Sequence, residues 1–147
     1  MADESRYRLG AVRDARSLAE RGKRSELAAA VGDAREAQAR LEAARTRTAA
    51  ARQALATALA TRDRLVQTGT IPAHLIAAER FVTRRRHELE ATLGEELRLE
   101  AAVDAQQDSV DVARRTLART RADRELIDRH FARWREARKK LAERRGD

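Results

Sequence analysis

The chain has 147 residues and a formal net charge of +8, with 38% charged residues, 3% aromatic residues and no cysteine. So much charge with so few aromatic side chains excludes a compact globule with a thick core and favours an elongated helical protein. The lack of cysteine excludes disulfides, thiolate catalysis and zinc sites built on cysteine.

The first predicted helix covers about residues 4–67. Asp3 or Ser5 can cap its start, and Leu9, Val12 and Leu18 begin an apolar stripe along it. The segment before the helix lacks the apolar region of a signal peptide, and no run in the chain approaches the ~20 apolar residues of a membrane span. We therefore expect a cytoplasmic protein.

A clearer ladder, in alternate steps of three and four residues, follows from residue 27. Its members are Leu27, Ala30, Ala34, Ala37, Leu41, Ala44, Thr48, Ala51, Leu55, Ala58, Arg62 and Leu65. This spacing is typical of a helix that turns one face toward a partner helix. Continued backwards, the ladder meets Lys23 and Glu20, so we expect the register to shift between residues 18 and 27.

The segment 67–72, Gln-Thr-Gly-Thr-Ile-Pro, is the one strong helix breaker in the chain. Gly69 suits the C-terminal cap of a helix, Pro72 suits a first helical turn, and Thr70 can cap the new helix between them. These residues predict a turn over about 68–71.

The second predicted helix covers about residues 72–145. Alternate steps of three and four run from Leu75 to Leu141 without a break, as in a long helix with a single seam. Several seam positions are polar, and such positions reduce stability but specify register and partner. They are Arg85, Glu96, Gln106, Arg124 and Arg138.

Two arms of nearly equal length around a short turn predict an all-α fold, a long antiparallel two-helix coiled-coil hairpin that forms a single domain. Reflecting the sequence about residues 69 and 70 matches the two seams. It places Leu41 beside Leu99, and Tyr7 near Phe131. A dimer of hairpins stays open, because a bare pair of helices buries only one narrow seam.

The sequence contains no motif for catalysis, phosphate binding or metal binding. No glycine lies in a G-x-x-x-x-G-K or G-x-G-x-x-G pattern, and His74, His87 and His130 are too scattered for a local metal site. We therefore expect a protein that is not an enzyme, needs no cofactor and has no small-molecule substrate.

Basic residues crowd both ends of the chain, and a hairpin would bring these ends together as one basic tip. Such a tip attracts nucleic acid, an anionic membrane or an acidic protein surface. Phe131 and Trp134 lie on the seam there, and we expect them to pack on Tyr7, Leu9 and Val12. Alternatively, Trp134 is partly exposed and anchors a partner.

Apolar residues also cluster just after the turn. Ile76 and Phe81 lie off the seam, and two helices cannot bury them together with His74 and Leu75. We interpret Ile76 and Phe81 as an exposed patch that contacts another protein. The alternative is that they fold back over the turn.

Taken together, the basic first helix, the Gly-Thr-Ile-Pro turn and the second helix resemble the FliJ and YscO proteins, the central stalks of flagellar and virulence-associated type III export machines. The resemblance is carried by the Tyr7-Arg8-Leu9 start, the Leu-rich entry over 75–82 and the Ala-Arg-Arg-Thr-Leu-Ala segment over 113–118. The Arg-rich end over 131–141 is more similar to the injectisome branch than to the flagellar one.

The resemblance implies a non-enzymatic hairpin, similar to the coiled coil of the ATP synthase γ subunit, that works in the cytoplasm at the inner-membrane export apparatus. Its end with both termini would enter the hexameric export ATPase and stimulate it. Its other end would reach the cytoplasmic domain of the export-gate membrane protein, and secretion chaperones are further implied partners. The ATPase-facing residues would be Arg6, Arg8, Arg13, Arg133, Arg135, Arg138, Lys139 and Lys140, and the gate-facing residues His74, Ile76 and Phe81.

Two functions of other classes stay open: a basic coiled coil that binds nucleic acid, and a purely structural dimeric coiled coil. Nucleic acid is not the expected partner, because the few aromatic residues lie mostly on the seam and no standard binding module is present. A steep salt dependence of binding to single-stranded nucleic acid would favour the first function. A concentration-dependent molecular mass would favour the second.

Overall fold

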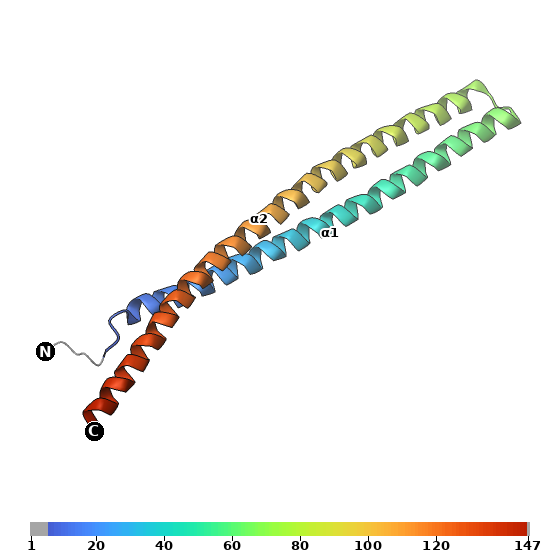
Figure 1. Ribbon diagram of the computed structural model, residues 1–147. Coiled ribbons are helices and arrows are strands. Elements are labelled where there is room, and N and C mark those ends of the chain that lie inside the picture. Colours follow the sequence, from blue (N-terminus) through green and yellow to red (C-terminus); the bar gives the residue numbers. More distant parts are fainter. Residues whose placement is uncertain (1–5, 147) are drawn as a thin grey trace. The chain divides into compact units, whose positions relative to one another are not determined.

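The computed structural model describes residues 6–146, which form two α-helices and no strand. Helix α1 covers Gly10–Thr68 and helix α2 covers Pro72–Gly146, joined by residues 69–71 as a helical hairpin (Figure 1). The all-α hairpin predicted from the two ladders is therefore confirmed.

Helix α1 begins at Gly10, later than the residue 4 expected from the sequence. Residues 6–9 form a turn instead, in which the Gly10 amide donates to the Tyr7 carbonyl at 3.1 Å. Leaving the helix allows Tyr7 to reach aromatic side chains of α2, which are described below. The expected caps Asp3 and Ser5 lie outside the described residues.

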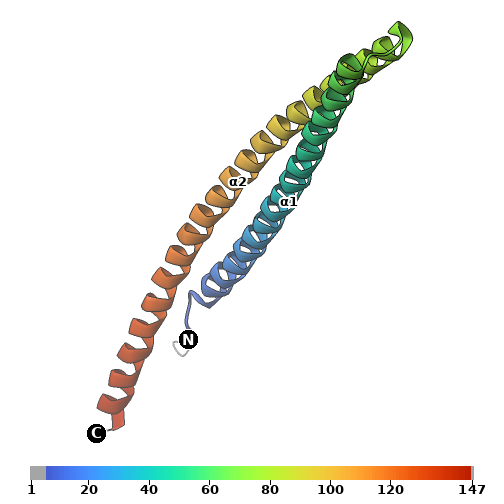
Figure 2. The ribbon, with the colours of Figure 1, turned by 90° about the vertical axis from the view of Figure 1, so that its right-hand side faces the viewer.

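The hairpin divides into two compact units, a division that the two ladders do not predict. We call Asp33–Gln107 the turn unit, because it contains the connection between the helices. The terminal unit comprises Met1–Gly32 together with Asp108–Asp147. In each unit a stretch of α1 packs against a stretch of α2 (Figure 2).

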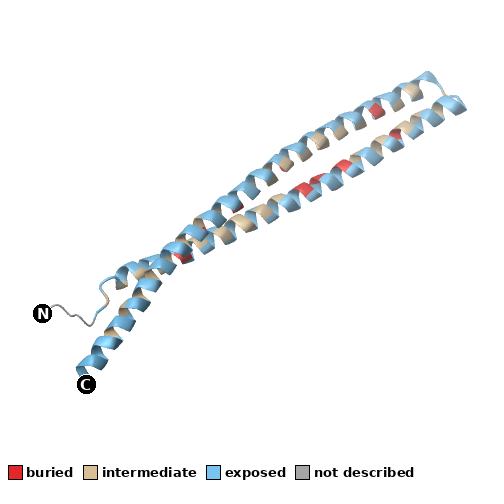
Figure 3. Cartoon of the chain, in the orientation of Figure 1, coloured by how far each residue is buried: buried red, intermediate tan, exposed pale blue. Residues whose placement is uncertain are grey.

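In the turn unit the ladder residues form the core, as their spacing predicts. Leu41, Ala44 and Leu99 make a hydrophobic cluster against which Val103 packs, and Val82 is completely buried. Leu41 thus lies beside Leu99, as expected from the reflected sequence. Buried and half-buried residues recur along each helix, between exposed residues (Figure 3). A small residue facing a larger one lets the two helices approach closely.

The terminal unit has a polar ladder on α1, which corrects the expected apolar stripe. Leu18 is 68% exposed, and Leu9 and Val12 are also exposed. The buried face instead continues from Leu27 through half-buried Lys23 to Glu20, which is only 2% exposed. The expectation that the register would shift to exclude these two polar residues is therefore wrong.

Two of the three residues that predicted the turn, Gly69 and Pro72, act as expected, and Thr70 does not. Gly69 has a φ of 79°, which ends α1 in the left-handed region, and Pro72 is the first residue of α2. Ile71 caps α2 through its carbonyl, which accepts hydrogen bonds from the amides of His74 at 3.1 Å and Leu75 at 3.4 Å. The Thr70 hydroxyl, the expected cap, lies 3.3 Å from His74 Nδ1 instead.

We expect Gly69→Ala to lower the free energy of unfolding by about 1 kcal/mol, because a Cβ atom is disfavoured at this positive φ. A Cβ there would meet no other atom within 4 Å, so the effect is conformational rather than a clash. Gly94 provides the matched control, because it lies inside α2 at an ordinary φ with equally open surroundings. Gly94→Ala should raise stability by about 1 kcal/mol.

Urea unfolding followed by circular dichroism at 222 nm measures both variants. Opposite signs for the two alanine substitutions are expected. Equal signs would contradict the left-handed conformation of Gly69.

Candidate interaction surfaces

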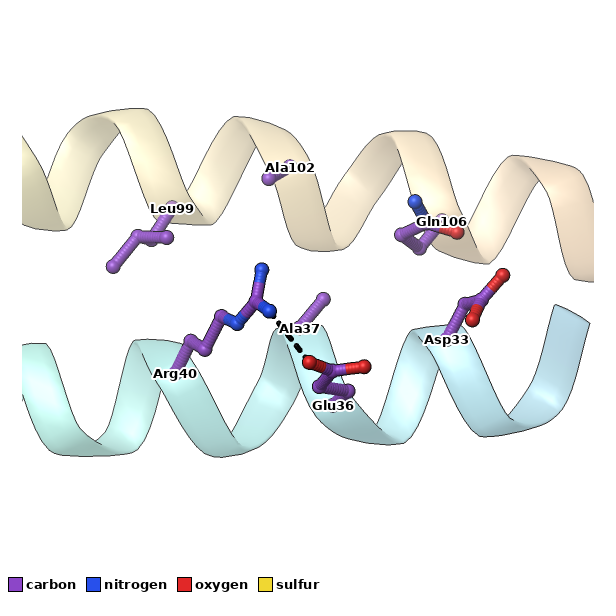
Figure 4. Close-up of a pocket in the computed structure, with 7 residues that line it drawn as sticks. All are labelled: Asp33, Glu36, Ala37, Arg40, Leu99, Ala102 and Gln106. Carbon is purple, nitrogen blue, oxygen red and sulfur yellow. Dashed lines mark hydrogen bonds and ion pairs between the residues drawn. The ribbon is translucent and has the colours of Figure 1, made fainter.

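A groove in the turn unit lies where two alanines, Ala37 and Ala102, leave space between the helices (Figure 4). The remaining lining residues are Asp33, Glu36, Arg40, Leu99 and Gln106. Glu36 is paired with Arg40, and the lining offers no nucleophile. Within residues 6–146, no three His, Asp or Glu side chains are grouped to hold a metal ion. The groove is therefore a gap in packing, and the surfaces at the two ends of the hairpin are stronger candidates for binding a partner.

Tyr7 connects the two ends of the chain in the terminal unit. Its hydroxyl lies 2.8 Å from His130 Nδ1, and its ring centroid lies 5.0 Å from that of Phe131 and 5.1 Å from that of Trp134. Phe131 and Trp134 also stack on each other, with centroids 5.7 Å apart. The predicted packing of Phe131 and Trp134 on Tyr7 is thus confirmed.

Leu9 and Val12, the other expected partners of these aromatic residues, are exposed. They line a side groove together with Leu126 and Ile127, bordered by charged and polar side chains. The border consists of Arg16, Asp123, His130 and Arg133. Leu9 and Val12 therefore line this groove and are not buried under the aromatic cluster.

Arg13 differs from the other arginines that the resemblance assigns to the ATPase. Its Nε donates to Asp128 Oδ1 at 2.8 Å, and its guanidinium lies 4.2 Å from the Phe131 ring centroid. The Arg13 side chain therefore holds the two helices together, and its charge is balanced within the terminal unit.

The other expected ATPase-facing residues form a basic surface, which we call the basic end. It comprises Arg6, Arg8, Arg133, Arg135, Arg138, Lys139 and Lys140. Arg6 and Arg8 flank Tyr7, and the contacts of Tyr7 bring them to α2. Arg138 is half-buried, with its guanidinium 5.8 Å from the Trp134 ring centroid, and the other residues of the basic end are exposed.

Within the terminal unit, α2 continues past the residues that face α1. From residue 135 to residue 146 every residue is exposed except Arg138, including Leu141, which the sequence placed on the seam. Among the described residues, the ion pairs of Lys139 and Lys140 run along their own helix and are long, 4.0 Å to Glu143 and 3.9 Å to Glu136. The basic end therefore presents its charge to the surroundings.

A buried charge cluster lies further along the terminal unit. Arg24 Nη2 donates to Glu20 Oε1 at 2.6 Å, and Arg121 Nε lies 3.4 Å from the same oxygen. Arg124 Nε lies 2.8 Å from Glu20 Oε2 without hydrogen-bond geometry, so this attraction is mainly coulombic. The ladder spacing could have predicted this cluster, because Glu20 and Arg124 both occupy ladder positions.

The three expected gate-facing residues of the turn unit are exposed but do not form one patch. Ile76 borders a shallow groove with Leu75 and Arg80, whereas the Phe81 ring lies 4.8 Å from the Arg85 guanidinium. Five residues along a helix correspond to a rotation of about 140°, which separates Ile76 from Phe81. Their predicted exposure is confirmed, and the alternative that they fold back over the turn is wrong.

Comparison with known proteins identifies no relative of this chain. No protein-family model matches the chain, and no curated protein or solved structure matches it significantly. Within residues 6–146, neither helix has an apolar stretch long enough to cross a membrane.

Proposed function

We propose that this chain is a non-enzymatic stalk of a type III export apparatus, which docks its basic end into the hexameric export ATPase and stimulates it. The observation that carries the proposal is the basic end itself. The Tyr7 contacts join both ends of the chain there, and residues 135–146 extend as a basic helix that is exposed except at Arg138. The resemblance to the FliJ and YscO proteins supplies the partner.

Electrostatics provides the docking mechanism. A concentrated positive surface accelerates encounter with an acidic pore and orients the stalk before close contact forms. Because the charges of Arg135 and Lys139 are exposed, salt screens their attraction, and the Debye length falls from about 10 Å at 0.1 M to about 3 Å at 1 M. Docking should therefore weaken as the salt concentration rises.

In the same proposal the turn unit contacts the cytoplasmic domain of the export-gate membrane protein, with His74, Ile76 and Phe81 as contact residues. The chain then works in the cytoplasm, at the periphery of the inner-membrane export apparatus. Secretion chaperones are further partners in this proposal. The exposed position of Ile76 and Phe81 supports a contact at this end.

Nucleic-acid binding is less well supported by the basic end. Bases stack on free aromatic faces in proteins that bind single strands. Here Tyr7, Phe131 and Trp134 pack on one another, and Arg13 covers the Phe131 ring. The cluster is therefore better suited to holding the helices together than to stacking on bases.

The test is the rate of ATP hydrolysis by the cognate export ATPase with and without this chain. We expect clear stimulation at moderate salt that fades as salt rises, because the docking charges are exposed. Circular dichroism and sedimentation at several concentrations check that the added protein is helical and report its mass. Absence of stimulation by the folded protein at every salt concentration would reject the stalk function.

A further inference from the structure

Residues 65–78, which surround the turn, carry no charged side chain, although 38% of the whole chain is charged. This is the longest uncharged stretch in the sequence, and we call it the apolar cap. Three of its large aliphatic side chains are exposed to solvent, because Ile71 is 57% and Ile76 is 52% exposed, and Val66 is exposed on α1. Such a concentration of exposed apolar surface at one end of the turn unit indicates a binding surface.

Arginines lie just beyond the apolar cap on both helices. Arg64 on α1 and Arg80, Arg84 and Arg86 on α2 are exposed. Within the part of the chain that the structure describes, none of these four has a carboxylate within ion-pair distance. We call these four residues the arginine collar.

The nearby carboxylates are neutralised by other arginines. Arg62 lies 2.9 Å from Asp63 and 3.5 Å from Glu79, and hydrogen bonding to Asp63 raises the pKa of Arg62. Arg85 lies 2.6 Å from Glu88. Because the local negative charges are paired in this way, the collar presents positive charge.

The spacing of cap and collar fits the depth of a lipid headgroup layer. At a rise of ~1.5 Å per residue, Arg64 lies about 6 Å from the end of α1 and Arg80 about 12 Å from the start of α2. Headgroup layers are about 5–8 Å thick, and interfacial segments sink about 5–10 Å into the headgroup and acyl boundary. A cap at that depth leaves Arg64 and Arg80 level with the phosphates, within reach of their flexible side chains. Arg84 and Arg86 lie about 18 and 21 Å from the start of α2, and they attract the anionic surface from a greater distance.

We propose that the turn end binds the surface of an anionic lipid bilayer, with the apolar cap in the interfacial region and Arg64 and Arg80 of the arginine collar on lipid phosphates. A bilayer surface fits this end, because Val66, Ile71 and Ile76 come from α1, the connection and α2, and one lipid surface can contact all three while the nearby arginines reach its phosphates. The uncharged polar residues of the turn are tolerated there, since the interface still holds water. This inference does not depend on the proposed export function.

The test uses environment-sensitive dyes on single cysteines, which the cysteine-free chain makes unambiguous. Ile71→Cys reports on the cap, and Leu97→Cys is the control, because Leu97 is 68% exposed on α2 of the same unit but outside the cap. Leu141→Cys reports on the basic end. With phosphatidylglycerol-containing vesicles, we expect dye emission to rise several-fold at position 71 and to stay unchanged at position 97.

Three results would overturn the proposal. The first is that the chain does not bind these vesicles, and the second is that it binds vesicles of phosphatidylcholine alone equally well. The third is that it binds but dye emission rises only at position 141. The last result would show that the basic end alone attracts the anionic surface.

Charge substitutions measure the contribution of each part. Ile71→Glu with Ile76→Glu should weaken vesicle binding about tenfold or more, whereas Leu97→Glu should leave it unchanged. Arg80→Ala should weaken binding about fivefold, because a basic residue near an anionic surface contributes on that scale. All these side chains are exposed, so the hairpin should fold in each variant. Unaltered binding after the double glutamate substitution would contradict insertion of the cap.

Discussion

Replacing Glu20 by lysine should lower the free energy of unfolding by about 3 kcal/mol, because it removes a buried seam carboxylate that faces three arginines. Glu20 is 2% exposed, and Arg24, Arg121 and Arg124 all approach its carboxylate. The lysine would place a fourth positive charge there. A loss of about 3 kcal/mol is at the lower end of the range for breaking a buried ion pair. The loss is small because the three arginines are partly exposed, so that their guanidinium groups can be hydrated after the substitution.

A paired substitution tests whether the charge cluster stabilises the fold or only specifies how the two helices pair. Glu20→Leu with Arg124→Leu should raise the free energy of unfolding by about 1–4 kcal/mol, because packed aliphatic residues avoid the desolvation of buried charge. Urea unfolding followed at 222 nm measures both variants, with Leu18→Lys as the control, since Leu18 is exposed on the same helix. A loss of stability in the double leucine variant as large as in Glu20→Lys would contradict this account.

The charge cluster fixes the register of the terminal unit, where few large apolar residues can do so. Glu20 on α1 attracts Arg121 and Arg124 on α2, and Arg13 on α1 pairs with Asp128 on α2. Sliding one helix by a turn would break these contacts and bury charge without a partner. In the turn unit, the cluster around Leu41 and Leu99 provides the same specificity by packing.

The sequence was sufficient to predict the hairpin because the repeat of three and four residues fixes which face of a long helix is buried. It therefore placed Leu41 beside Leu99, and Tyr7 beside Phe131, correctly. The same reasoning explains the error at Leu18. A continuous helix keeps its phase, so the face set by the ladder from Leu27 onward carries Glu20 inward although it is charged.

Side-chain pairing could not be predicted in this way. Which arginine neutralises which carboxylate depends on rotamers and on contacts between helices, and the sequence shows neither. Arg13 was expected to face a partner and is paired with Asp128, whereas Arg80 and Arg84 have no ion pair among the described residues. The difference between a structural arginine and an available one therefore appears only in three dimensions.

Charge reversal at the basic end should weaken the proposed stimulation of the export ATPase without unfolding the chain. We expect Arg135→Glu with Lys139→Glu to raise the concentration for half-maximal stimulation about tenfold or more, because repulsion replaces attraction at the docking surface. Both residues are exposed, on the part of α2 that extends past α1. The unfolding midpoint should therefore stay within the error of the wild-type value.

Arg115→Glu with Arg119→Glu is the matched control for this variant. These two arginines are exposed on the same helix and in the same unit, with the same four-residue spacing, and their reversal changes the net charge equally. If docking depends on the basic end, the control should keep most of the stimulation and the steep salt dependence, whereas Arg135→Glu with Lys139→Glu should flatten that dependence. Equal losses in the two variants would mean that total charge attracts the ATPase, and the basic end would then have no specific part in docking.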